Sequence, residues 1–112
     1  MDVDRVAQRI LKLRLWPNSE NQQWKQNVVD LNGEVICVSQ FTLFGNIKKG
    51  AKPDFHNAAK GPRAQELYNQ VLEKVKEGLP RGEVGDGVFG AMMDVALVND
   101  GPVTIEYDTK KE

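Results

Sequence analysis

The sequence predicts a single α+β domain. Two amphipathic helical segments alternate with apolar, strand-like segments along its 112 residues, and this order is typical of helices packed on a sheet. No repeat, linker or low-complexity tract divides the chain, so we expect one domain over residues 1–112.

The first expected element is a helix that begins at Asp2 and stops before Pro17. Asp2 and Asp4 favour this start, because carboxylates stabilise the N-terminal end of a helix. Apolar side chains recur every three or four residues, as on the buried face of an amphipathic helix: Val3, Val6, Ala7, Ile10, Leu11 and Leu13.

The second expected element is a buried strand over 34–38. Cys37 lies among its aliphatic residues, which favours a small buried hydrophobic residue over a nucleophile. Ser39, Gln40 and Thr42 continue the strand with polar side chains that a pure core would not contain. We therefore expect a functional site at the end of this strand.

Residues 45–61 contain three glycines, a proline and several lysines, which predicts an exposed loop. Lys48, Lys49 and Lys52 lie close together in it. One interpretation is a solvated loop, and the other is a small patch that binds one end of an RNA. A net charge of −1 argues against a protein that coats nucleic acid along its whole surface.

A second helix is expected from about Pro62, since proline is favoured in the first turn. A glycine-rich connection over 78–87 follows it. The apolar face of this second helix carries Ala64, Leu67, Tyr68, Val71, Leu72 and Val75.

Two further strand-like runs, 95–98 and 103–107, flank a turn that contains Gly101 and Pro102. A Gly-Pro bond is one of the few that can adopt the cis form at low cost. The alternative interpretation is an ordinary hairpin turn.

Five sequence segments together resemble the D-aminoacyl-tRNA deacylase family, in its eukaryotic form. The family signatures SQFTL and NxGPxT match at every fixed position, and the similarity runs from about Asp4 to Tyr107. The five segments are Ser39–Leu43, Asn99–Thr104, Phe89–Met93, Lys48–Gly50 and Lys52–His56.

The resemblance implies a layered β/β/α domain with two stacked sheets and a helical layer. Family members usually begin with a further N-terminal segment that contains a first β-hairpin, and this sequence lacks it. We expect either that the sequence is incomplete at its N-terminus or that the missing strands are supplied in another way, and favour the former.

The resemblance also implies hydrolysis of the ester bond of D-aminoacyl-tRNA, and of glycyl-tRNA mischarged on the alanine tRNA. The implied catalytic residues are Ser39, Gln40, Phe41 and Thr42, whose main-chain groups hold the ester carbonyl while the 2′-hydroxyl of the terminal adenosine assists. Positioned N–H donors suit an ester that is already activated. Thr42 remains either a hydrogen-bonding group or a nucleophile.

Selection of the D-enantiomer is implied to rest on a cis Gly101–Pro102 turn that reaches into the partner's site in a homodimer. Such a turn would reject L side chains by steric clash. Asn99 and Thr104 flank it.

Phe89 and Met93 are implied to bind the terminal adenine. Phe89, Met92 and Met93 have a second interpretation as core residues. Lys48, Lys49 and Lys52 are implied to contact the tRNA.

Several other classes of function are not supported by the sequence. His56 is the only histidine and Cys37 the only cysteine, so no zinc-ligand cluster exists, and we expect neither a metal nor a cofactor. His56 is expected at the surface rather than as a general base. No apolar segment suggests a membrane span or a targeting signal, and we expect a cytoplasmic protein. The alternatives are a non-catalytic nucleic-acid-binding or interaction protein, and an inactive fragment.

Overall fold

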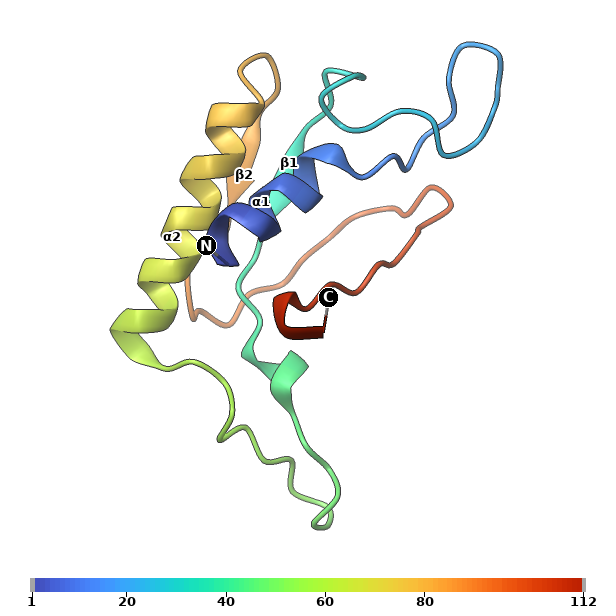
Figure 1. Cartoon of the computed structure of the whole chain (residues 1–112). Coiled ribbons are helices and arrows are strands. Elements are labelled where there is room, and N and C mark those ends of the chain that lie inside the picture. Colours follow the sequence, from blue (N-terminus) through green and yellow to red (C-terminus); the bar gives the residue numbers. More distant parts are fainter. Residues whose placement is uncertain (1, 112) are drawn as a thin grey trace.

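Two helices dominate the computed structural model, which describes residues 2–111. Helix α1 spans Asp2–Lys12 and helix α2 spans Gly61–Gly78, close to the bounds that the apolar patterns predict. The helices pack against each other (Figure 1). The mixed α/β class is confirmed.

The sheet consists of strands β1 (Val35–Cys37) and β2 (Val84–Asp86), which pair in parallel. Val35 lies opposite Val84, and Cys37 lies opposite Asp86. A parallel pair needs a crossover connection, and α2 supplies it. Strand β2 falls within the segment for which the sequence predicted only a connection. That prediction was wrong, because the short strand is defined by its partner rather than by its own glycine-rich sequence.

The core lies between the helices and the turns that precede the strands. Val75 is fully buried. A β-carbon on Gly78 would collide with the Leu11 side chain, so the end of α2 lies directly against α1. The buried apolar side chains are Ala7, Val28, Leu72, Val75 and Leu79.

The predicted extension of the first strand through Ser39, Gln40 and Thr42 was wrong. The strand ends at Cys37, and Phe41–Phe44 forms a 3₁₀ turn, η1. Residues 41–44 are all exposed. Without a neighbouring strand to bond their N–H and C=O groups, these residues make a local turn instead.

The prediction of two further strands, over 95–98 and 103–107, was also wrong. Both runs lie outside the helices and strands, and they pair with no other segment among residues 2–111. Figure 1 shows this part of the chain, orange to red, as a long loop beside the sheet. A second short 3₁₀ turn, η2 (Thr109–Lys111), follows. The described residues thus form one two-stranded sheet rather than two stacked sheets.

The prediction of a cis bond between Gly101 and Pro102 was wrong as well. Residues 2–111 contain no cis peptide, so Gly101–Pro102 is trans. Gly101 has φ of 61°, a left-handed conformation that glycine adopts without strain. The turn is exposed, and no neighbouring atom lies where a Gly101 side chain would begin. The trans form is the lower-energy one for a bond that precedes proline, and the exposed turn adopts it.

Candidate functional site

The main cavity is an apolar pocket of about 790 Å³ beyond the carboxyl end of β1. Three segments that are distant in the sequence form it: 38–44, the loop and helix start at 55–68, and 89–95. Ligand pockets of this volume commonly combine apolar walls with a few polar groups. The first and third segments contain the Ser39–Leu43 and Phe89–Met93 motifs.

A hydrogen bond from the main chain of one motif to a side chain of the other joins the two motifs. The N–H of Gly90 donates to Ser39 Oγ at 3.4 Å, a long bond between residues 51 positions apart in the sequence. Ser39 therefore lies beside the turn that carries Phe89 and Met93, and all three residues line the pocket. Two of the motifs that the sequence singled out, Ser39–Leu43 and Phe89–Met93, thus lie together at one pocket.

Gln40 links Thr42 to this site. Gln40 Nε2 donates to Thr42 Oγ1 at 2.7 Å. Gln40 and Phe41 line the pocket and Thr42 does not. The hydroxyl of Thr42 acts as an acceptor in this bond, so its own proton remains available for a second hydrogen bond.

Tyr68 on helix α2 also lines the pocket. Its hydroxyl lies 2.8 Å from the carbonyl oxygen of Cys37 and also bonds to Asp86 Oδ1, so one side chain ties together the ends of β1 and β2. Burial, and then the neighbouring Asp86, raise the pKa of Tyr68 above its ordinary value, which keeps the phenol protonated at neutral pH. The Tyr68 ring lies 5.6 Å from the ring of Phe89.

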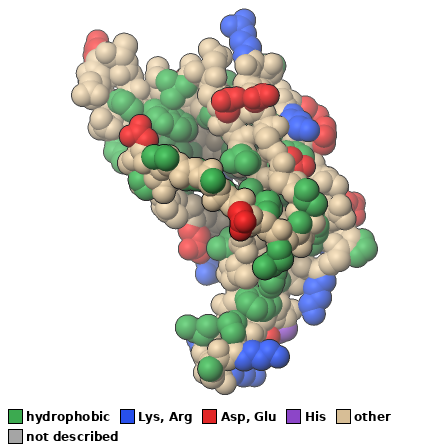
Figure 2. Space-filling view, turned by 180° about the vertical axis from the view of Figure 1, so that it is seen from behind, with side chains coloured by type: hydrophobic (Ala, Val, Ile, Leu, Met, Phe, Trp, Pro, Cys, Tyr) green, Lys and Arg blue, Asp and Glu red, His purple; other side chains and the backbone are tan. Residues whose placement is uncertain are grey.

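A second aromatic pair closes the pocket from the loop side. The rings of Phe41 and Phe55 meet edge to face, with their centres 5.0 Å apart. This geometry is favourable for aromatic pairs, and it holds the loop against η1. Figure 2 shows exposed apolar side chains running along this face toward the lower tip of the molecule.

The Gly-Pro segment lies outside this pocket. Asn99, Gly101, Pro102 and Thr104 are all exposed, and none of them lines it.

The loop lysines also lie outside the pocket. Lys48 borders a separate hollow of about 390 Å³ next to Phe44. Lys49 and Lys52 are exposed. Figure 2 shows basic side chains at the lower tip of the molecule.

The histidine and the cysteine of the sequence, His56 and Cys37, both lie outside the lining of the pocket. His56 is exposed, and its Nδ1 lies 2.5 Å from Asp54 Oδ2. Hydrogen bonds from the main-chain N–H of His56, and then from its ring, lower the pKa of Asp54. Burial, and then Asp86, raise the pKa of Cys37, which keeps its thiol neutral at neutral pH. Residues 2–111 contain no cluster suited to a metal ion and no helix able to cross a bilayer.

Sequence reasoning missed Tyr68 and Phe55 as pocket residues. Tyr68 belongs to the apolar stripe of α2, whose spacing predicts core residues throughout its length. In fact only Leu72 and Val75 of the stripe are buried, whereas Ala64, Leu67 and Tyr68 line the pocket. The available signal was the hydroxyl of Tyr68 within an otherwise aliphatic stripe. A buried phenol needs a hydrogen-bond partner, which indicates a polar contact rather than a purely apolar core position.

Comparison with known proteins identifies the family. A model described as D-Tyr-tRNA(Tyr) deacylase matches residues 1–108. The chain belongs to this deacylase family. A D-aminoacyl-tRNA deacylase of Yarrowia lipolytica is 68% identical over 99% of this chain and 73% of its own length. That of Schizosaccharomyces pombe is 56% identical over 98% of this chain and 73% of its own.

A solved structure supports the same fold. The c-Myc DNA Unwinding Element Binding Protein superposes with a TM-score of 0.85 at 40% identity, covering 96% of this chain and 71% of its own. The resemblance seen in five short segments thus extends over nearly the whole of this chain, which spans 73% of the length of these two deacylases.

Proposed function

We propose that the chain hydrolyses the ester bond of D-aminoacyl-tRNA in the cytoplasm, releasing tRNA and the free amino acid. One observation carries the proposal beyond family membership: the Ser39–Leu43 and Phe89–Met93 motifs meet at a single apolar pocket, joined by the Gly90–Ser39 hydrogen bond. Phe89 and Met93 would bind the terminal adenine, since contact between a base and an aromatic ring contributes about 1–3 kcal/mol.

In this proposal the ester carbonyl is held by main-chain N–H groups of residues 40–42. Stabilising the developing oxyanion in this way is worth about 2.7–4 kcal/mol per donor elsewhere. Water attacks the carbonyl, the bond to the 3′-oxygen breaks, and the 2′-hydroxyl of the adenosine assists the proton transfer. His56 and Cys37 do not line the pocket, so in this proposal the proton transfer is assigned to the substrate.

Selection between enantiomers would come from the Gly101–Pro102 turn of a second copy. The turn is exposed and does not line the pocket of its own chain. Apolar side chains around it are also exposed, including Val98 at 95% and Val103 at 51%, as expected for an interface between copies. Asn99 and Thr104 would support the turn.

Glycyl-tRNA would also be a substrate, because glycine has no side chain for the turn to reject. The proposal requires only that main-chain groups of the turn reach the substrate amine; it does not include a cis bond. Lys48, Lys49 and Lys52 would contact the RNA near its 3′ end.

A direct test compares D-tyrosyl-tRNA with L-tyrosyl-tRNA. We expect the D-form to be hydrolysed at least tenfold faster, a difference of about 1.4 kcal/mol in activation free energy. The measurement is the release of labelled amino acid over time, with spontaneous hydrolysis subtracted. Equal rates for the two enantiomers would contradict the proposal.

Replacing Thr42 with alanine distinguishes a supporting hydrogen bond from a nucleophile. We expect kcat to fall about tenfold, because one supporting hydrogen bond is lost while the main-chain donors remain, and this corresponds to about 1.4 kcal/mol. Thr42→Ser, which keeps the hydroxyl, should restore most of the activity. Complete loss in Thr42→Ala with an unchanged circular dichroism spectrum would assign Thr42 as the nucleophile instead.

A second candidate function is binding of nucleic acid without catalysis. It is favoured by the similar solved structure, whose name describes a DNA-binding protein. The same assay separates the two candidates, because a binder would retain tRNA on a filter without releasing amino acid.

A further inference from the structure

The carbonyl oxygen of Cys37 accepts two hydrogen bonds at the end of β1, just before the Ser39–Leu43 motif. One comes from the Tyr68 hydroxyl at 2.8 Å, and the other comes from the main-chain N–H of Gly87 at 3.3 Å. Gly87 directly follows β2 and precedes the Phe89–Met93 motif. Helix α2 and the two segments that carry the motifs therefore meet at this carbonyl.

The hydrogen bond from Tyr68 is shorter than two others that link these segments beyond the sheet. Bonds from N–H groups to oxygen are typically about 2.9–3.0 Å long. The Gly87 bond at 3.3 Å and the bond from Gly90 to Ser39 at 3.4 Å are both longer, and therefore weaker. The Tyr68 hydroxyl also bonds to Asp86 Oδ1 at the end of β2. One side chain of α2 thus fixes the ends of both strands.

We infer that Tyr68 is a positioning residue for the hydrolysis, because its hydroxyl sets the spacing between the main-chain donors of residues 40–42 and the wall formed by Phe89 and Met93. The inference rests on the proposed function, in which the donors hold the ester carbonyl and the wall binds the adenine. Both groups belong to one substrate molecule, so the distance between their binding sites decides whether the carbonyl reaches its donors. A misplacement of about 1 Å can lower a rate by about 100-fold.

The ring and the hydroxyl of Tyr68 contribute to the site in different ways. The ring lies 5.6 Å from the ring of Phe89 and belongs to the lining of the apolar pocket. The hydroxyl bonds to the two strand ends. Tyr68→Phe keeps the ring and removes only the hydroxyl, so it tests the spacing without removing a wall of the pocket.

The first experiment compares the kinetic constants for D-tyrosyl-tRNA with the dissociation constant of adenosine monophosphate (AMP), which presents only the adenosine end of the substrate. For Tyr68→Phe we expect kcat to fall at least tenfold, equivalent to about 1.4 kcal/mol. KM and the dissociation constant of AMP should each change less than about twofold. A side chain that served only the stability of the fold would instead lower turnover and AMP binding together, in proportion to the folded fraction.

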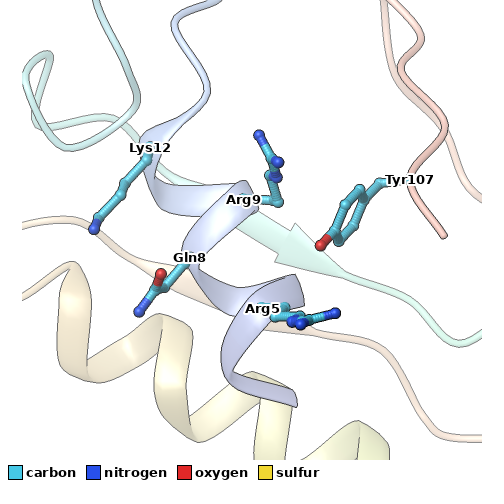
Figure 3. A pocket seen from close by; sticks show the side chains of 5 residues that line it. All are labelled: Arg5, Gln8, Arg9, Lys12 and Tyr107. Carbon is cyan, nitrogen blue, oxygen red and sulfur yellow. The ribbon is translucent and has the colours of Figure 1, made fainter. Parts of the chain in front are cut away.

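Two control variants change residues outside the pocket. Gln8 lines a separate hollow of about 390 Å³ beside helix α1 (Figure 3), and none of the described residues lines both this hollow and the apolar pocket. Gln8→Ala removes an exposed polar group from a helix. Val75→Ala removes methyl groups from a fully buried position on α2 and lowers the stability of the fold. Both variants should keep kcat within about twofold of the parent at temperatures where they are folded.

Returning hydrogen-bond donors to the same position tests the hydroxyl directly. Replacing Tyr68 with 4-aminophenylalanine keeps the ring and supplies two N–H donors. These donors match the two acceptors, the carbonyl of Cys37 and the carboxylate of Asp86. We expect this variant to recover most of the kcat that Tyr68→Phe loses.

The second experiment measures the spacing without a reaction. The main-chain N–H groups of Gly87 and Gly90 bond from one segment to the other, so their proton chemical shifts in NMR spectra report on the separation. We expect both signals to move upfield in Tyr68→Phe, because their hydrogen bonds lengthen, and to stay in place in Gln8→Ala.

Four results would overturn the inference. They are a parental kcat in Tyr68→Phe, an equal loss of kcat and of AMP affinity in that variant, unchanged Gly87 and Gly90 signals, and a 4-aminophenylalanine variant no more active than Tyr68→Phe. If the parent does not hydrolyse D-tyrosyl-tRNA, the proposed function fails, whereas the NMR measurement still tests whether Tyr68 sets the spacing.

Discussion

Gly82→Ala is expected to lower the free energy of unfolding by about 3 kcal/mol, at the upper end of the usual cost of overpacking. A β-carbon on Gly82 would collide with the carbonyl oxygen of Gly33 and would lie 2.8 Å from Leu79 Cγ. The Gly33 oxygen belongs to the backbone and cannot turn aside. The turn after α2 and the turn before β1 would therefore have to separate.

The separation would propagate into the sheet. The N–H of Val35 donates to the carbonyl of Glu83 at 3.0 Å, directly beyond the Gly82–Gly33 contact, and the parallel pairing starts there. Leu79, which is 3% exposed, would also lose its packing. Because small domains have a stability of only about 5–15 kcal/mol, this single methyl group removes a large share of it.

Urea unfolding followed by circular dichroism measures the effect. The matched control is Gly85→Ala in β2, where the nearest atom to an added β-carbon is 3.6 Å away and the backbone needs no left-handed conformation. The control should change the free energy of unfolding by less than about 1 kcal/mol, since an alanine without a clash is tolerated and restricts the unfolded chain. Equal midpoints for the two variants would contradict the packing argument.

The contrast between Gly82 and Gly85 shows what sequence reasoning could and could not predict. Both glycines lie in a segment that the sequence marks as a connection, and only the structure shows that one of them faces a backbone oxygen across the chain. The helices were predictable because their apolar spacing is local. The partner of β1 was not, because strand pairing depends on contacts between residues about 50 positions apart.

The same limit applies to the site. The Ser39–Leu43 and Phe89–Met93 segments were identifiable from their sequence motifs. Their meeting at one pocket was not, because it depends on where α2 places Tyr68 and on the loop that carries Phe55. The 3₁₀ turn at Phe41–Phe44 was misassigned, because a short apolar run next to a strand looks the same whether or not a partner strand lies beside it.

Ala64→Trp is expected to lower kcat/KM at least 100-fold, which corresponds to about 2.7 kcal/mol in transition-state stabilisation. Ala64 lies on the half of α2 that lines the apolar pocket. An indole there would occupy the space between α2 and the Phe89–Met93 segment, where the terminal adenine is proposed to bind. The loss should appear both with D-tyrosyl-tRNA and with a D-tyrosylated single-stranded RNA that contains only the 3′-terminal nucleotides, because both present the same end to the pocket.

Gln65→Trp is the matched control. It places the same side chain one position along α2, at an exposed residue outside the pocket. Alanine has a higher helix propensity than glutamine, but the two substitutions differ in this respect by only roughly a few tenths of a kcal/mol, so a 100-fold difference in kcat/KM reports on the pocket rather than on the helix. An active Ala64→Trp enzyme with parental kcat/KM would show that the substrate binds elsewhere.

The Ala64→Trp variant, whose pocket is blocked, also tests where the turn that selects the D-enantiomer comes from. The proposal places the Gly101–Pro102 turn of a second copy at the pocket. A chain with Ala64→Trp keeps its Gly101–Pro102 turn, and a chain in which Asn99–Thr104 is replaced by serines keeps its pocket. If the turn acts between copies, mixing the two variants places an intact turn against an intact pocket. We then expect enantioselective hydrolysis to return in the mixture although neither variant shows it alone. A mixture with no more selective activity than its components would mean that the turn does not serve the pocket of another copy.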